Sequence, residues 1–118
     1  MVGLTYPDVF LGGYVFGDGP ARSFAGESVG LFRDRLNPAL RTIYAAADAP
    51  LLDVTQLTGG YDPLDRTVVQ PPYGTVPEPV ARVCELTFYC SRKDVHPTPA
   101  GHALIADEIL RLVPLTSP

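Results

Sequence analysis

Basic residues are scarce in this sequence and nowhere clustered. Its 118 residues include nine Lys and Arg against 13 Asp and Glu, so the formal net charge is −4 and the isoelectric point is about 4.9. Nucleic acids and anionic membrane surfaces are bound through clustered cations. The charge pattern therefore argues against both as partners.

Long hydrophobic runs are also missing. A membrane-spanning helix needs roughly 18 or more consecutive apolar residues, and no run in the chain approaches that length. The first residues lack the positively charged segment and the following apolar segment of a signal peptide. We therefore expect neither a membrane span nor an export signal within these residues.

Cysteine and histidine are limited to two residues each. Cys84 and Cys90 are close in sequence, and an even number of cysteines favours a disulfide and an oxidising compartment. Two reduced thiols fit the sequence nearly as well. A metal site on two thiols would need further ligands, which only the histidines could readily provide.

The rest of the composition predicts a folded globule. Hydrophobic residues make up 46% of the chain and charged residues 19%, which is typical of one modest domain spanning residues 1–118. The patterns predict a strand over residues 2–5, a loop over 17–23, helices over 23–36 and 38–47, and a buried strand over 51–55. Asn37 is expected to cap the second helix and Pro38 to begin it.

The second half of the chain begins with an irregular stretch. Residues 56–77 are rich in Gly, Pro, Tyr and Thr and show no periodicity, so we expect a long loop, either functional or packed on the body. A short helix is predicted from Pro79 to Glu85, and a last helix with Thr98 as N-cap and Pro99 as first residue. On that helix His102, Ala106, Ile109 and Val113 should share one face.

The order of strand, helix pair, strand and helix is that of one side of an α/β parallel sheet. Two strands do not make a stable parallel sheet, because both faces and both edges need cover. The chain is therefore expected to be part of a larger fold. If it folds alone, its open first strand and apolar helix faces predict self-association.

The stretch DVHPTPAGH, residues 94–102, holds both histidines. His96 could act as a general base in a loop before a helix, and Asp94 could accept a hydrogen bond from its ring and fix the tautomer. The same residues could instead form a turn that leads into the last helix, with Asp94 solvated or in an Asx-turn. His102 is expected to be a packed or surface residue.

The segment KDVHPTPAGHALIADEIL resembles the C-terminal motif of the SGNH (GDSL-type) hydrolases. VARVCELTFYCS is similar to the cysteine-bracketed segment of a secreted bacterial branch of that family, and VGLTYPDVFLG and LLDVT resemble its later strands and loops. The resemblance implies a flavodoxin-like three-layer α/β/α parallel-sheet fold, of which this chain would be the C-terminal part. It also implies a secreted or cell-envelope location for the parent protein.

The activity implied by the resemblance is hydrolysis of carboxylic esters, of the lipase or esterase type. A Ser would attack an acyl-ester or lipid-like substrate, with His96 as the base and Asp94 as its orienting acid. No motif calls for a metal or an organic cofactor.

The sequence departs from the family in the blocks that should supply the nucleophile and the oxyanion hole. No G-D-S block is present, and Phe16-Gly17-Asp18-Gly19, its nearest match, has Gly at the nucleophile position and is interpreted as a chance turn. The single Asn is Asn37, outside any G-x-N-D block. None of the four serines is in a nucleophile-like context: Ser23, Ser28, Ser91 and Ser117.

The acid is also displaced, because the commonest family spacing would put it at Lys93. A backbone carbonyl near Lys93 could therefore orient His96 in place of Asp94. Asp53 could line the crevice or cap the next turn, and Tyr61 and Tyr73 could select the acyl group or serve in packing.

Two hypotheses follow. In the first, the chain is the C-terminal half of a hydrolase and supplies His96 and Asp94 to a serine on another segment or chain, such as one upstream of Met1. In the second, it is a truncated or degenerate, non-catalytic domain that acts in binding or assembly. Both predict that the isolated chain has no serine-dependent esterase activity.

Overall fold

The computed structural model describes residues 1–16 and 19–113, which form a mixture of helices and short strands. The predicted α/β class is confirmed as a mixture of helices and strands. In chain order the elements are β1 (Gly3–Leu4), the 3₁₀ helix η1 (Val9–Val15), α1 (Gly19–Leu31), the π-helical η2 (Phe32–Leu36), α2 (Asn37–Ala46), β2 (Leu51–Leu52), α3 (Val54–Leu57), β3 (Thr67–Gln70), β4 (Gly74–Pro77), α4 (Glu78–Leu86), α5 (Tyr89–Arg92) and α6 (Pro99–Leu112).

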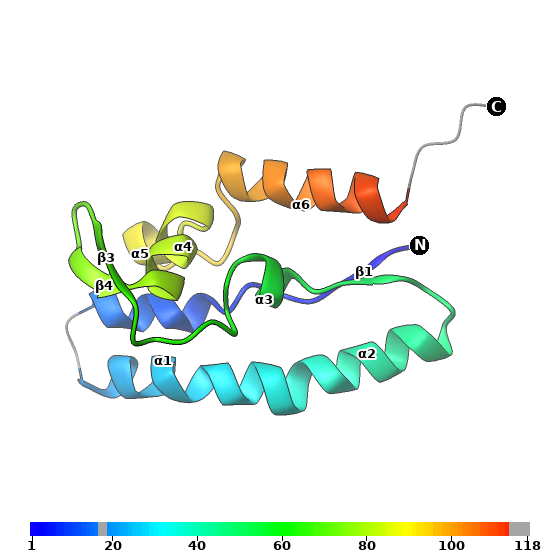
Figure 1. Ribbon diagram of the computed structural model, residues 1–118, viewed down its shortest axis with the longest axis horizontal. Coiled ribbons are helices and arrows are strands. Elements are labelled where there is room, and N and C mark those ends of the chain that lie inside the picture. Colours follow the sequence, from blue (N-terminus) through cyan, green and yellow to red (C-terminus); the bar gives the residue numbers. More distant parts are fainter. Residues whose placement is uncertain (17–18, 114–118) are drawn as a thin grey trace.

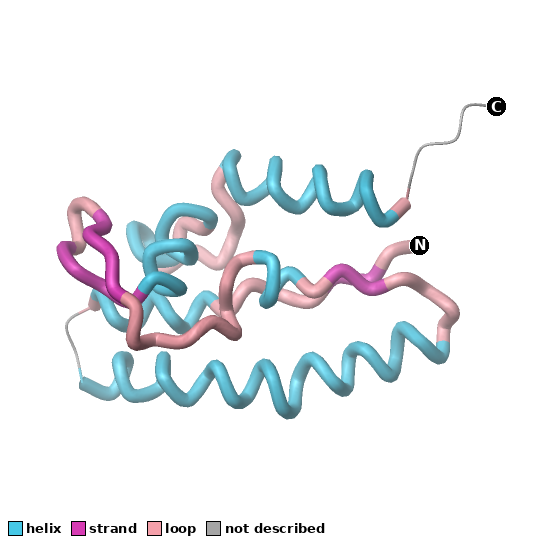
Figure 2. The backbone as a smooth tube through the Cα atoms, viewed as in Figure 1, coloured by secondary structure: helices cyan, strands magenta, loops and turns pink. Residues whose placement is uncertain are grey.

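A short parallel pair of strands lies between two helices. β1 pairs with β2 in the register Gly3↔Leu51, and the long helix α1–η2–α2 forms the crossover between them. Figure 1 shows α2 on one side of this pair and α6 on the other. Both strands are only two residues long, so helices and loops dominate the backbone, as Figure 2 shows. No helix in the described part of the chain is long and apolar enough to cross a membrane.

The predicted break at Asn37-Pro38 is wrong, because one helix runs through it. A proline inside an α-helix lacks the N–H for the i→i−4 bond and clashes with the preceding turn. Here the turn before it widens to π geometry, and the Asn37 N–H donates to the Phe32 carbonyl. This wider turn accommodates Pro38. Asn37 has helical dihedral angles of φ −71° and ψ −36° and caps nothing.

The expected loop over residues 56–77 is also partly wrong. It contains the end of α3 and an antiparallel hairpin, β3–β4, with Gln70 opposite Gly74. β-Branched residues lie on both sides of the turn, Val68 facing Val76 and Val69 facing Thr75. β3 is mostly exposed, so it shows no alternation of polar and apolar residues. The strand predicted over 51–55 is shorter than expected, because Asp53 caps α3 and Val54 begins it.

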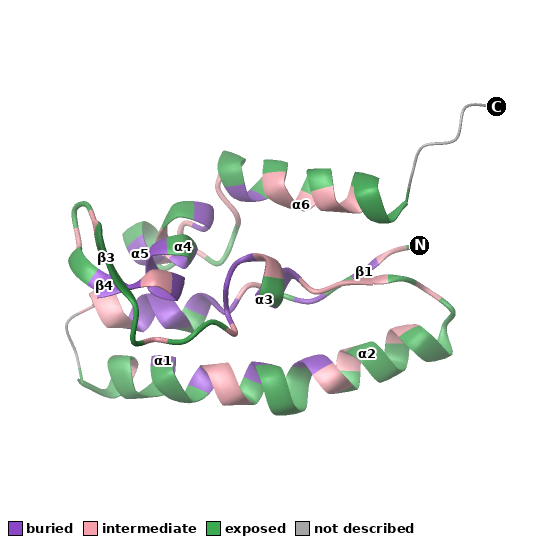
Figure 3. Ribbon diagram, in the orientation of Figure 1, coloured by how far each residue is buried: buried purple, intermediate pink, exposed green. Residues whose placement is uncertain are grey.

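The hydrophobic core is small and lies at one end of the molecule. Leu11 of η1 packs there with Val76, Val80, Ala81 and Val83. Figure 3 shows this buried region around η1 and α4, whereas α2 and α6 are largely exposed. The radius of gyration is 15.1 Å, compared with about 13.5 Å for a compact domain of this length. The fold therefore leaves much of its surface without cover.

The last helix begins as predicted, with Thr98 as N-cap and Pro99 in the first turn. Of the residues expected to share one face, Ile109 is half-buried and His102, Ala106 and Val113 are exposed. Gly101 packs closely against the end of α4, because a Cβ there would lie 2.2 Å from the Leu86 carbonyl oxygen.

The predicted disulfide between Cys84 and Cys90 is confirmed. The sulfur atoms are 1.96 Å apart and the Cα atoms 5.1 Å apart. The bond joins α4 to α5, and the two cysteines are neither free thiols nor metal ligands.

A buried carboxyl group makes the stability of this fold depend on pH. Asp8 is fully buried, with Oδ2 2.6 Å from the Ser28 hydroxyl. Burial raises the pKa of Asp8 from 3.8 to about 6, although the Ser28 hydrogen bond opposes the shift. As pH rises from 4 to 6 the unfolded chain loses this proton before the folded chain does. The contribution of Asp8 to the free energy of unfolding is therefore fully present below pH 4. It falls by about 3 kcal/mol as pH rises past the pKa of Asp8 in the folded state.

We expect Asp8→Asn to remove this loss, because an amide stays neutral and its oxygen can still accept from Ser28. Urea unfolding of both proteins at pH 4, 5, 6 and 7 measures the difference. An equal decline in stability of the two proteins across this range would contradict the assignment.

Candidate functional site

The loop before α6 is closed at its base by hydrogen bonds. Thr87 bridges to Pro97, the Phe88 N–H donates to the His96 carbonyl at 3.0 Å, and the Thr98 N–H donates to the Leu86 carbonyl at 2.9 Å. The Thr98 hydroxyl lies 2.9 Å from the Glu85 carbonyl and accepts from Gly101 at 3.2 Å. The backbone of His96 is thus fixed to the end of α4.

Asp94 and His96 contact each other within this loop. Asp94 Oδ1 accepts the main-chain N–H of His96 at 2.9 Å and lies 2.5 Å from His96 Nδ1. The first contact is an Asx-turn and the second is the carboxylate–imidazole contact expected of a base and its orienting acid. The geometry therefore shows the Asx-turn together with a contact between the Asp94 carboxylate and the His96 ring.

The Asp94 carboxylate determines which ring nitrogen carries the proton. The main-chain N–H of His96, and then its ring, lower the pKa of Asp94. An ionised carboxylate can only accept hydrogen bonds, so the neutral imidazole carries its proton on Nδ1. Nε2 then has a free lone pair, and the His96 side chain is 78% exposed. This is the arrangement that a general base needs.

An apolar groove lies beside this pair, at the carboxyl end of β1. Its volume is about 330 Å³. Val95, the residue between Asp94 and His96, forms part of its wall. In open α/β sheets ligands bind outside the carboxyl ends of the strands. The full lining consists of Tyr6, Pro7, Val9, Phe10, Phe32, Leu36 and Val95.

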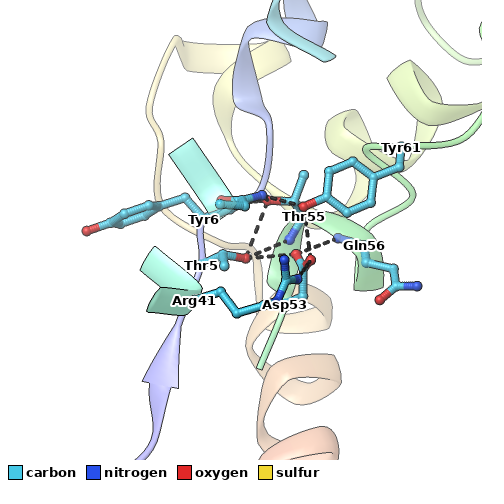
Figure 4. Close-up of polar contacts among 8 residues, drawn as sticks. Thr5, Tyr6, Arg41, Asp53, Thr55, Gln56 and Tyr61 are labelled. Carbon is cyan, nitrogen blue, oxygen red and sulfur yellow. Dashed lines mark hydrogen bonds and ion pairs between the residues drawn. The ribbon is translucent and has the colours of Figure 1, made fainter. Parts of the chain in front are cut away.

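A buried polar cluster holds the strand ends against the long helix (Figure 4). Thr55 Oγ1 donates to the Tyr6 carbonyl and accepts from Asn37 Nδ2 at 2.9 Å. The Thr55 N–H donates to Thr5 Oγ1 at 3.1 Å, and the Thr5 hydroxyl donates to Asp53 Oδ1 at 3.0 Å. Tyr61 belongs to this cluster, because its hydroxyl donates to Asp53 Oδ2 at 2.9 Å.

Asp53 caps the following turn, the second of the roles considered for it, and the cleft that it lines is separate from the apolar groove. Its Oδ1 accepts the Gln56 N–H at 3.0 Å and so caps α3. It also lines a polar cleft with Arg41 and Glu108, where Arg41 Nη2 lies 3.4 Å from Asp53 Oδ2. Tyr73 packs partly buried against the hydrophobic core.

The described serines do not complete a catalytic triad. Ser28 is buried, with its hydroxyl 2.6 Å from Asp8 and 2.7 Å from the Ala25 carbonyl. Ser91 donates to the Phe88 carbonyl at 3.4 Å, and Ser23 is exposed on α1. No hydrogen bond among residues 1–16 and 19–113 joins a serine to the His96 ring. Ser117, and Gly17 and Asp18 of the turn considered above, lie outside the described residues.

Sequence reasoning missed the groove. Its lining comes from three separate segments, and neither spacing nor composition shows that they converge. The available signal was the motif YPDVF, which places four apolar or aromatic side chains just after a predicted strand.

Comparison of the chain with protein-family models, curated proteins and solved structures finds no match. The resemblance to the SGNH hydrolases therefore rests on the motif residues alone.

The Asp94–His96 contact can be measured by titration. We expect carbon-13 NMR of the Asp94 carboxyl to give a pKa below 3.8, because two His96 groups donate to it. Asp94 therefore contributes stability above pH 4, which is lost as pH falls through its folded pKa. His96→Ala removes the ring but keeps the main-chain N–H, so the pKa should rise only part of the way. His102→Ala is the matched control and should leave the pKa of Asp94 unchanged. If His96→Ala also leaves that pKa unchanged, the His96 ring is not a partner of Asp94.

Proposed function

We propose that this chain supplies the general base and its orienting carboxylate to a serine hydrolase of carboxylic esters of the SGNH type. One observation carries the proposal: Asp94 contacts Nδ1 of His96, which leaves Nε2 open to solvent, and Val95 between the two residues lines an apolar groove. The serine and the oxyanion-hole donors would come from another segment or another chain.

The chemistry follows from the free Nε2 atom. His96 takes the proton of the serine hydroxyl as its oxygen attacks the ester carbonyl, and it returns the proton to the alcohol as the ester bond breaks. The same nitrogen then takes a proton from water as the water oxygen attacks the acyl-serine. It returns that proton to the serine oxygen as the acyl–serine bond breaks and the carboxylic acid leaves. Asp94 stabilises the imidazolium that forms in each half of the reaction.

The hydrogen bonding of β1 supports the proposal that another segment completes the sheet. The Gly3 N–H donates to the Pro50 carbonyl at 2.8 Å, and the Thr5 N–H donates to the Leu52 carbonyl of β2 at 3.0 Å. In a parallel ladder the residue between them points its N–H and C=O groups to the opposite edge. A strand that pairs with Leu4 there would extend β1 and β2 towards a flavodoxin-like three-layer sheet. The disulfide supports a secreted or cell-envelope location.

A non-catalytic role in binding or assembly is the second candidate. The observation that favours it is that no described serine contacts His96. In that case the uncovered surface of this elongated chain would serve a partner instead of completing an active site.

Mutation of His96 in a longer protein tests the proposal. The chain would be expressed together with the coding sequence that precedes Met1 in the same reading frame, and hydrolysis of p-nitrophenyl butyrate would be followed. We expect His96→Ala to lower kcat by about 10²–10⁴, because it removes the general base. His102→Ala, six residues away and exposed on α6, should stay close to wild type.

Two results would contradict the proposal. One is ester hydrolysis that His96→Ala leaves unchanged. The other is no hydrolysis by a folded longer protein, which would favour the binding role. The isolated 118 residues should show no turnover; turnover that His96→Ala abolishes would mean that the serine is already within them.

A further inference from the structure

We infer that Lys93 is a positioning residue for the Asp94–His96 pair, and that it acts through the left-handed conformation of its main chain. The inference rests on the proposed function, because the pair would be the base and its orienting acid. Lys93 has φ 54° and ψ 30° and ends α5. It is one of two non-glycine residues with positive φ in the described part of the chain, and the other is Asp48, with φ 55°.

The left-handed conformation of Lys93 reverses the chain after α5. The Lys93 N–H donates to the Tyr89 carbonyl at 2.8 Å, and the Asp94 N–H donates to the Phe88 carbonyl at 3.4 Å. These two bonds form the Schellman motif, in which one residue with left-handed dihedral angles follows a helix. Glycine is the usual residue at this position, because a Cβ atom makes the conformation unfavourable. Lys93 therefore holds a conformation that its own side chain opposes.

The reversal brings Asp94 and His96 to the same residue. The Phe88 carbonyl accepts from Asp94, and the Phe88 N–H donates to the His96 carbonyl at 3.0 Å. Three residues separate the end of α5 from His96, so the chain must turn sharply to make both contacts. With a negative φ at Lys93, the Asp94 N–H would leave Phe88. The Asp94 carboxylate would then no longer be held at Nδ1 of His96, which lies 2.5 Å from Oδ1.

The side chain of Lys93 makes a separate contact. Its ammonium group lies over the Phe16 ring, 4.8 Å from the centroid, which is within the range of a cation–π interaction. In the part of the chain that the structure describes, no hydrogen bond or ion pair joins this ammonium group to Asp94 or His96. The effect of Lys93 on the pair is therefore expected to come from its main chain.

Three substitutions separate the backbone conformation from the ammonium group. Lys93→Gly and Lys93→Val both remove the ammonium group, but glycine adopts the left-handed conformation readily and a β-branched residue does not. Asp48→Val is the matched control, because it places the same β-branched residue at the other left-handed position, in the turn after α2. Each variant of the 118-residue chain would be compared with the wild type.

Two NMR measurements report on the pair without any turnover. In the wild type and in Lys93→Gly, we expect the pKa of the Asp94 carboxyl to lie below 3.8 and the uncharged His96 ring to carry its proton on Nδ1. Lys93→Val should raise the Asp94 pKa towards 3.8, because the carboxylate loses its His96 partners, and should move the ring proton towards Nε2. Asp48→Val should lower the free energy of unfolding and leave both readouts as in the wild type.

The longer protein described above offers a second readout. Displacing a catalytic group by about 1 Å can lower the rate about 10²-fold. We therefore expect Lys93→Val to lower kcat for p-nitrophenyl butyrate by about this factor with little change in KM. Lys93→Gly should keep kcat close to that of the wild type.

Three NMR results would overturn the inference. One is a Lys93→Val chain that keeps the lowered Asp94 pKa and the proton on Nδ1. Another is loss of both signals in Lys93→Gly, which would assign the role to the ammonium group. The third is an equal change in Asp48→Val, which would reduce the effect to stability alone.

Two provisions keep the test decisive. If Lys93→Val does not fold, Lys93→Ala takes its place, and relative to Lys93→Gly it should show the same changes at a smaller size. Identical readouts for the alanine and glycine variants would then overturn the inference. The NMR measurements need no serine, so failure of the His96 activity test alone leaves them standing, and the two proposals fail separately.

Discussion

A fully buried threonine, Thr55, holds this fold together at the point where its two parallel strands end. Its hydroxyl donates to the Tyr6 carbonyl and accepts from Asn37, so the end of β1 and the long helix are joined through one atom. Tyr6 forms one wall of the apolar groove, and Leu36 next to Asn37 forms another. Buried hydrogen bonds are directional and costly to leave unmade. These hydrogen bonds therefore set the spacing of the groove walls. The small hydrophobic core cannot do so, because it lies at the other end of the molecule.

The position of His96, the proposed general base, depends on a second, separate set of contacts. Thr98 caps α6 and binds back to the end of α4, and the disulfide ties α4 to α5. The loop between them has little freedom, so Asp94 and His96 are held in contact although the His96 side chain is largely open to solvent and Asp94 is only half-buried. Val95 then links the pair to the groove. The proposed ester hydrolysis rests on two features, a histidine whose Nδ1 contacts a carboxylate and an apolar groove lined by Val95.

Features that depend on neighbouring residues could be predicted from the sequence. Thr98-Pro99 begins a helix because a hydroxyl cap and a fixed φ act locally, and Cys84 and Cys90 are close enough to pair. Features that depend on distant contacts could not. The side chain of Asn37 binds Thr55 and Tyr61 and does not cap a helix. The reason is that a π-helical turn accommodates Pro38, so that one helix continues through Asn37. The exposed hairpin shows no alternation, and the groove combines residues from three segments. The Asp94–His96 pair was visible only because both residues are in one motif.

The imidazole of His96 offers the most direct measurement. If Asp94 binds Nδ1, nitrogen-15 NMR of the uncharged His96 ring should show the proton on Nδ1 and an unprotonated Nε2. Asp94→Asn should then shift the balance towards the proton on Nε2. A His96 ring that carries its proton mainly on Nε2 in the native chain would contradict its role as a base oriented by Asp94.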